Sequence, residues 1–242
     1  MSTPALNEHT FEKINCAIDE SIPAEASVMT LNGTINKSLI LLSSVILTSL
    51  ITYKFPLPAV VYWAVILIAL IVGIIICYKP HKAPTLSPVY AVLEGLSIGS
   101  LSGLVDRVCE DHIAIQAVLC TLAVVFAMLA AYRFGIIQVN KTFRTILHGA
   151  VYGVLLYYTF LIFTSLCGLY IAPLYCGTWA MVIDLIICGI AAFCLAEDFD
   201  NIRIGIESQA PKWVEWYCSY ALMVTIIWIY LQILRLLASR RR

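Results

Sequence analysis

Charged residues are scarce in this chain. They make up 12% of its 242 residues, whereas 61% are hydrophobic, and the mean hydropathy is +0.91. This composition excludes an ordinary soluble domain and predicts a lipid bilayer as the solvent. The 15 basic and 15 acidic residues cancel, so no overall positive field is available to attract nucleic acid.

Cysteine pairs and a signal peptide are also missing. The nine cysteines are scattered singly, with no C-x-x-C pair and no zinc-ligand spacing, so neither a disulfide framework nor a cysteine metal centre is expected. The front of the chain lacks a basic region followed by a short apolar core. The first apolar helix is therefore expected to act as its own insertion signal.

The sequence contains instead seven long apolar runs. A helix of about 20 residues crosses the roughly 30 Å of bilayer hydrocarbon with its backbone polar groups paired internally. The predicted helices cover residues 38–55, 57–78, 86–105, 113–133, 145–170, 178–197 and 216–237. The predicted fold class is all-α, a polytopic membrane protein with a seven-transmembrane-helix bundle. A polar cytoplasmic segment, 1–36, precedes the membrane domain, 37–242.

The polar front segment has two interpretations. Phe11, Ile14 and Ile18 have helical spacing, which is compatible with a short amphipathic helix on the membrane surface. A disordered tail is the alternative.

The orientation follows from lysine and arginine in the loops, because these residues favour the cytoplasmic side. One side carries Lys13, Lys37, Lys79, Lys82, Arg133, Lys141, Arg144, Arg203 and Lys212, and the other carries Lys54 and Arg107. This bias predicts a cytoplasmic N-terminus. It also places Arg235, Arg240, Arg241 and Arg242 outside, against the rule. We favour seven full crossings over a last segment that re-enters.

Small residues mark a helix contact. Gly95, Gly99 and Gly103 are four apart in the third helix, and this small-xxx-small spacing lets another helix approach closely. Gly149 and Gly153 form a weaker version in the fifth helix. The third helix is therefore expected to be central.

A few acidic residues fall in or beside the apolar runs, where charge costs several kcal/mol. Glu94 is expected to face the bundle interior in a functional role, with a protonated carboxyl bonded to a serine as the alternative. Asp184 either faces a path or snorkels to the surface. Asp198 and Asp200 either line the same path or are solvated residues at the end of the sixth helix.

Several blocks of the sequence resemble the bacterial branch of the Bax inhibitor family, the transmembrane Bax inhibitor motif proteins. The resembling residues are Pro4, Ala5, Leu6, Thr10, Phe11, Glu12 and Lys13, then Met29, Thr30, Gly33, Thr34, Asn36 and Lys37, then 87–96, Tyr132, Arg133 and Gly135, and finally Asp198, Phe199, Asp200, Ile202, Gly205, Glu207, Ala210, Pro211, Lys212, Glu215, Trp216, Tyr217 and 233–237. The last block is the most specific.

The resemblance implies a seven-helix bundle with the last helix near the centre and a calcium leak that responds to pH. In that family an aspartate ending the sixth helix and another in the seventh share a proton. Asp198 matches the first. The second is missing, because residues 216–242 contain no acid and Thr225 stands near its place. The paired sensor is therefore not carried over intact.

Two function classes compete. The first is a pH-sensitive calcium or cation leak along Asp198, Asp200, Glu94, Asp184 and Thr225, in which Asp198 and Asp200 offer the oxygen ligands that calcium prefers. The alternative is a non-conducting protein that binds and modulates a membrane protease or another membrane complex. No enzymatic activity, cofactor or nucleic-acid partner is expected. A bacterial inner membrane is the expected location.

Overall fold

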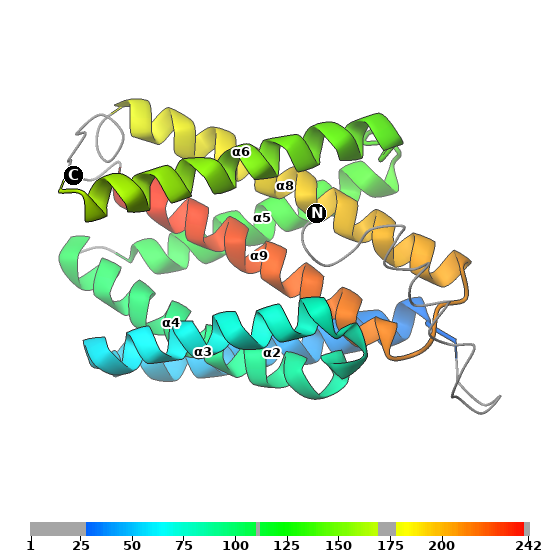
Figure 1. The fold of residues 1–242 in the computed structure, drawn as a ribbon, viewed down its shortest axis with the longest axis horizontal. Coiled ribbons are helices and arrows are strands. Elements are labelled where there is room, and N and C mark those ends of the chain that lie inside the picture. The colour runs from blue at the N-terminus through cyan, green and yellow to red at the C-terminus, as the bar shows by residue number, and fades with distance from the viewer. Residues whose placement is uncertain (1–27, 110–111, 169–177, 240–242) are drawn as a thin grey trace. The chain divides into compact units, whose positions relative to one another are not determined.

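The computed structural model describes residues 28–109, 112–168 and 178–239, and these are helical almost throughout (Figure 1). The helices are α2 (Leu31–Lys54), α3 (Ala59–Tyr78), the 3-10 helix η1 (Pro80–Lys82), α4 (Ala83–Cys109), α5 (Ile113–Arg133), α6 (Lys141–Leu166), α8 (Thr178–Glu207) and α9 (Val214–Ser239). Within these described ranges, seven helices are long and apolar enough to cross a membrane. The predicted all-α, multi-pass membrane fold is confirmed.

The first helix begins earlier than the sequence predicted. It starts at Leu31 rather than at residue 38, so residues 31–36 belong to α2 and not to a polar segment. Thr30 is the N-cap, and its side-chain oxygen accepts a hydrogen bond from the Gly33 amide at 3.1 Å. The capped polar turn extends the helix beyond its apolar part. The amphipathic helix proposed around residues 11–18 lies outside the described residues.

The sixth membrane helix, α8, ends later than predicted. It continues to Glu207, whereas the prediction ended it at residue 197, where charged residues begin. Asp198 and Asp200 are therefore inside a helix rather than at its end. Their residues are only 1% and 3% exposed, so the alternative of solvated helix-end side chains is wrong.

The chain divides into two compact units, which are described separately. The first comprises residues up to 110 together with 198–224, and the second comprises 111–197 together with 225–242. The first unit holds α2, α3 and α4 with the end of α8 and the start of α9. The second holds α5 and α6 with the remainder of α8 and α9.

The glycine stripe of α4 makes the close contact that its spacing predicted. α4 packs against α2 and α3. A Cβ atom added at Gly95 would lie 2.6 Å from the carbonyl oxygen of Val45, and one added at Gly103 would lie 2.6 Å from that of Tyr53. Only glycine allows α2 this close at these positions.

The weaker glycine stripe of α6 makes no such contact. A Cβ atom added at Gly149 or Gly153 would meet no atom of the described chain within 4 Å. The same spacing thus marks a helix contact in α4 but not in α6, because spacing alone does not specify a facing helix.

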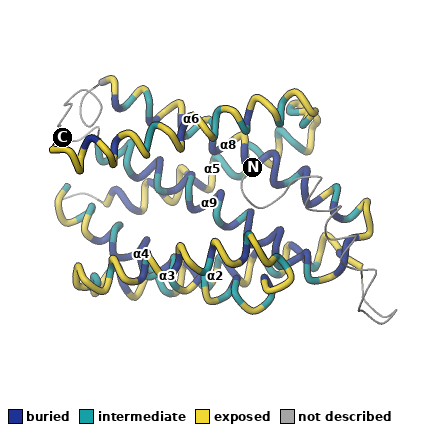
Figure 2. The backbone as a smooth tube through the Cα atoms, viewed as in Figure 1, coloured by how far each residue is buried: buried dark blue, intermediate teal, exposed yellow. Residues whose placement is uncertain are grey.

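Burial distinguishes the helices (Figure 2). None of the residues of α9 is exposed, and Tyr217, Met223 and Ile229 are completely buried. α3 and α6 instead expose many large apolar side chains, such as Trp63 and Leu156. The exposed apolar faces suit contact with lipid.

The contact between α2 and α4 can be tested by adding a single methyl group at one of the α4 glycines. Gly95→Ala is expected to lower the free energy of unfolding by about 1–3 kcal/mol, because its methyl group has to displace the α2 backbone. Denaturation in detergent measures the change. Gly149→Ala is the control, since its methyl group meets open space. Equal stability of the two variants would contradict the contact.

Candidate functional site

The end of α8 concentrates buried polar side chains. Glu197, Asp198, Asp200 and Asn201 are 0%, 1%, 3% and 2% exposed, in a helix that is otherwise largely apolar. Burying an acidic group is costly unless a partner compensates. These side chains are the strongest candidates for function in the described chain.

Glu197 is held by two basic side chains of α6. Its Oε1 atom lies 2.8 Å from Nε2 of His148 and 3.4 Å from Nη1 of Arg144. Arg144 and His148 are four residues apart, which places them on one face of α6. The rings of Phe143 and Phe193, 5.8 Å apart, pack the same two helices together beside this group.

Asp198 and Asp200 do not share one ligand position. Residues two apart on an α-helix point in nearly opposite directions, so one ion cannot bind both carboxylates directly. Asp200 pairs with Arg203 at 3.1 Å. In the part of the chain that is described, no three His, Cys, Asp or Glu side chains are grouped to hold a metal ion. The prediction that Asp198 and Asp200 bind calcium stays a prediction.

Asp184, nearer the start of α8, is also paired. It is 2% exposed, and its Oδ2 atom lies 3.3 Å from Nε of Arg235 in α9. The Arg235 guanidinium also lies over the ring of Tyr158, and Nε2 of Gln232 donates a hydrogen bond of 2.6 Å to the Tyr158 hydroxyl. Asp184 therefore does not snorkel to the surface, because its own side chain is buried and paired with Arg235.

The position of Arg235 changes the charge count of the tail. This residue lies inside α9 and is compensated by Asp184, so it is not a loop charge. One of the four arginines that conflict with the predicted orientation is thereby removed from the count. Arg240, Arg241 and Arg242 lie outside the described residues.

Glu94 is half-buried on α4 and is bound by neighbours on its own helix. Tyr90 donates a hydrogen bond to Oε1 at 3.1 Å, and Ser97 donates one to Oε2 at 3.2 Å. The serine contact is the one that the alternative interpretation of Glu94 anticipated. Thr225, which stands where the resemblance places a second acid, is buried in α9 at 3% exposure.

The predicted path residues are thus distributed over both units. Glu94, Asp198 and Asp200 belong to the first unit, and Asp184 and Thr225 belong to the second. Asp184 and Asp198 share α8, as predicted, but Asp184 is already engaged in an ion pair.

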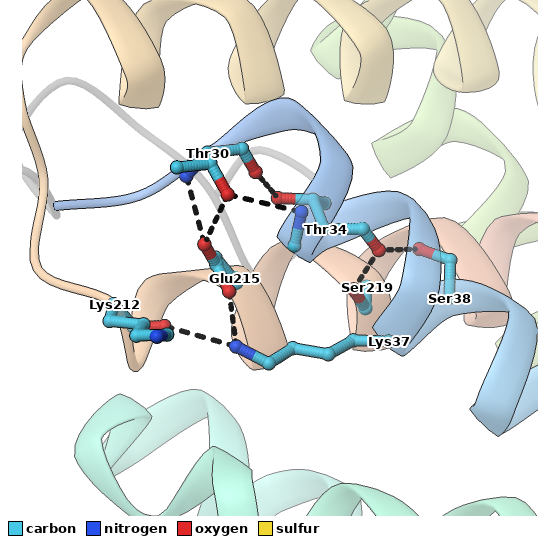
Figure 3. Close-up of polar contacts among 8 residues, drawn as sticks. Thr30, Thr34, Lys37, Ser38, Lys212, Glu215 and Ser219 are labelled. Carbon is cyan, nitrogen blue, oxygen red and sulfur yellow. Dashed lines mark hydrogen bonds and ion pairs between the residues drawn. The ribbon is translucent and has the colours of Figure 1, made fainter. Parts of the chain in front are cut away.

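A further buried acid, Glu215, joins the starts of α2 and α9 (Figure 3). Its side chain is completely buried and accepts hydrogen bonds from the Thr30 amide at 2.8 Å and the Thr30 hydroxyl at 3.1 Å. Lys37 forms an ion pair with its other oxygen and also contacts the Lys212 carbonyl oxygen at 3.5 Å. We call this group of four residues the Glu215 clamp.

Backbone contacts support the Glu215 clamp. The Met29 amide donates to the Ala210 carbonyl at 2.8 Å, beside a single β-bridge between Val28 and Pro211. A Cβ atom added at Gly33 would collide with the Glu215 carboxylate, so a larger residue there would displace that carboxylate. The clamp thus needs both side-chain and backbone features.

The sequence prediction missed Glu215 as a site residue. It lies among the residues that carry the family resemblance, as do Thr30, Gly33 and Lys37. The structure brings these two distant blocks together. The presence of both blocks in one sequence indicated that they could be functionally important. Neither block contains a local pattern that identifies the other as its contact.

The Glu215 clamp is expected to contribute to stability. Glu215→Ala leaves the Lys37 ammonium and the Thr30 amide without their buried partner, and should lower the free energy of unfolding by about 3–5 kcal/mol. Denaturation in detergent measures the loss. The control is Glu207→Ala, since Glu207 pairs with Arg203 at 3.6 Å on the surface, where a pair contributes less than about 1 kcal/mol. Similar losses in both variants would show that Glu215 is not a clamp.

The pair of Asp184 and Arg235 is expected to behave as a unit. Asp184→Asn and Arg235→Met should each destabilise the protein, whereas the double variant should lose less than the sum by roughly 0.5–3 kcal/mol. The physical reason is that each single change leaves the other charge without its partner. Unfolding measurements on all four proteins complete the cycle, and additive losses would argue against the pair.

The comparisons with known proteins agree with this architecture. The model of the family described as Bax inhibitor 1 like matches residues 3–242. A search of curated proteins and a search of solved structures each returned no match. The family match covers both blocks that meet in the Glu215 clamp and the whole acidic end of α8. This integral, multi-pass membrane chain belongs to the Bax inhibitor 1 like family.

Proposed function

We propose that the protein is a pH-sensitive calcium or cation leak whose path follows the acidic end of α8. The observation that carries this proposal is the burial of Glu197, Asp198 and Asp200 within four consecutive positions of a membrane helix. Ionisable side chains inside membrane spans are costly and commonly mark ion paths. A structural role alone does not require three acids so close together.

The roles of the path residues follow from their chemistry. Carboxylates suit calcium because it prefers hard oxygen ligands. In the proposal, Asp198 is the main acid of the path and Glu94 is a second one on α4. Asp184, held by Arg235, and Thr225 belong to the same path away from this end. An ion would pass these groups in sequence, with no catalytic step and no bound cofactor.

The proposal includes a location and an orientation. Seven apolar helices and the loop charges suit a bacterial inner membrane with a cytoplasmic N-terminus. The loops on the same side as the N-terminus carry more lysine and arginine than the loops on the other side, and this excess supports the orientation. The assignment of Arg235 to an internal ion pair reduces the conflict at the other end.

A second candidate is a non-conducting protein that binds a membrane protease or another membrane complex. The observation that favours it lies in α9. Its acidic residue, Glu215, is engaged by Lys37 and Thr30, and Thr225 occupies the place that the resemblance gives to a proton-sharing acid. In this second candidate, a chain without the proton-sharing acid in α9 does not conduct ions and instead binds another membrane protein.

Calcium flux into liposomes distinguishes the two candidates. Purified protein is reconstituted around a calcium dye, and uptake is compared at acid and neutral pH for wild type, Asp198→Asn and Glu94→Gln. The leak predicts that Asp198→Asn changes the flux or its pH dependence several-fold, because it removes a buried charge from the path. Glu207→Gln, at an exposed site, is the matched control and should behave as wild type.

The outcomes separate clearly. In one outcome, the protein passes calcium faster than empty liposomes do, with the same flux in wild type and in Asp198→Asn. That result would reject the assigned path. No flux at either pH would reject the leak and support the binding protein. The binding protein also predicts co-purification with a large membrane complex, lost when residues 1–27 are deleted.

A further inference from the structure

The contact between Glu197 and α6 combines three ionisable groups of different behaviour. Glu197 is completely buried, whereas the His148 and Arg144 side chains are 20% and 16% exposed. The imidazole is therefore partly accessible, while the carboxylate is inside the protein. Oε2 of Glu197 has no hydrogen-bond partner among the described residues.

The charge of this group depends on one proton. Arginine stays protonated throughout the physiological range. Histidine is the side chain whose ordinary protonation change falls between about pH 5 and 8. With His148 neutral, Arg144 and Glu197 cancel. With His148 protonated, the group carries one net positive charge directly beside Asp198 in the sequence.

Among the described residues of the second unit, the other charges do not duplicate this arrangement. On α8, Asp184 is paired with Arg235 of α9 and lies thirteen residues away along the helix. Arg133 of α5 and Lys141 of α6 are exposed. His112 precedes α5, at the end of that helix away from Arg133, and is exposed. On the far side of Asp198, Asp200 is paired with Arg203.

We propose that Glu197 and His148, with Arg144, form the proton-responsive site of this chain and control cation passage beside Asp198. This inference rests on the proposed leak and assigns its pH response to α6 and α8 instead of an acid pair between α8 and α9. When His148 is protonated, its positive charge opposes a cation at Asp198 and strengthens the tie between α6 and α8. Acid therefore lowers the flux.

Two substitutions at His148 imitate its neutral state and its protonated state, one each. His148→Gln keeps a hydrogen-bond donor but no charge, so its calcium flux should stay high from about pH 8 to pH 5.5. His148→Arg carries a permanent charge, so its flux should stay low over the same range. Wild type should change from high to low by roughly tenfold or more, because a unit charge close to a divalent ion has a large effect inside a protein.

The matched control is His112→Gln, which changes an exposed histidine outside this group. It should keep the wild-type pH response. Glu197→Gln should shift the pH at which the flux changes, because the carboxylate that binds the imidazolium is gone. A pH response in His148→Gln equal to that of wild type would overturn the proposal.

A measurement without flux separates this proposal from the leak itself. In labelled protein in lipid nanodiscs, the NMR signal of His148 is identified by its loss in His148→Gln. It should titrate in wild type, with a midpoint that moves in Glu197→Gln. If wild type passes no calcium but this midpoint moves, the leak fails and the proton site stands. An unmoved midpoint rejects the proton site, whether or not calcium passes.

Discussion

A charged side chain inside an apolar helix must find its compensation within the protein, since the bilayer offers none. Asp184 finds it in Arg235, Glu197 in Arg144 and His148, and Glu215 in Lys37 and Thr30. Each of these contacts joins two different membrane helices. The requirement that makes buried acids costly therefore also makes them specific connectors, which apolar packing alone would not provide.

The sequence predicted the features that depend on local pattern. Apolar runs long enough to cross a bilayer identified all seven membrane helices, and α5 has the predicted bounds. The stripe of Gly95, Gly99 and Gly103 correctly indicated a close helix contact. The predicted end of α8 was wrong, because the acidic residues were taken to mark the end of the helix. The helix continues there, since those side chains are buried by the fold.

The partners of the acids could not be predicted, because they come from distant parts of the chain. Arg144 and Glu197 are 53 residues apart, and Thr30 and Glu215 are 185 apart. A single sequence contains no periodicity that connects positions at such separations. Charge alone was also insufficient, since Glu94 is satisfied by tyrosine and serine of its own helix whereas Asp184 and Glu197 use basic residues of another helix.

The Glu215 clamp sets an order on biogenesis. Thr30 and Lys37 leave the ribosome with the first membrane helix, but Glu215 emerges only when nearly the whole chain has been synthesised. Until then the Lys37 ammonium remains without its native counter-charge while six helices are being inserted. The Glu215 clamp can therefore form only after the last helix has been synthesised and inserted. A chain truncated before α9 would keep Lys37 without its native counter-charge.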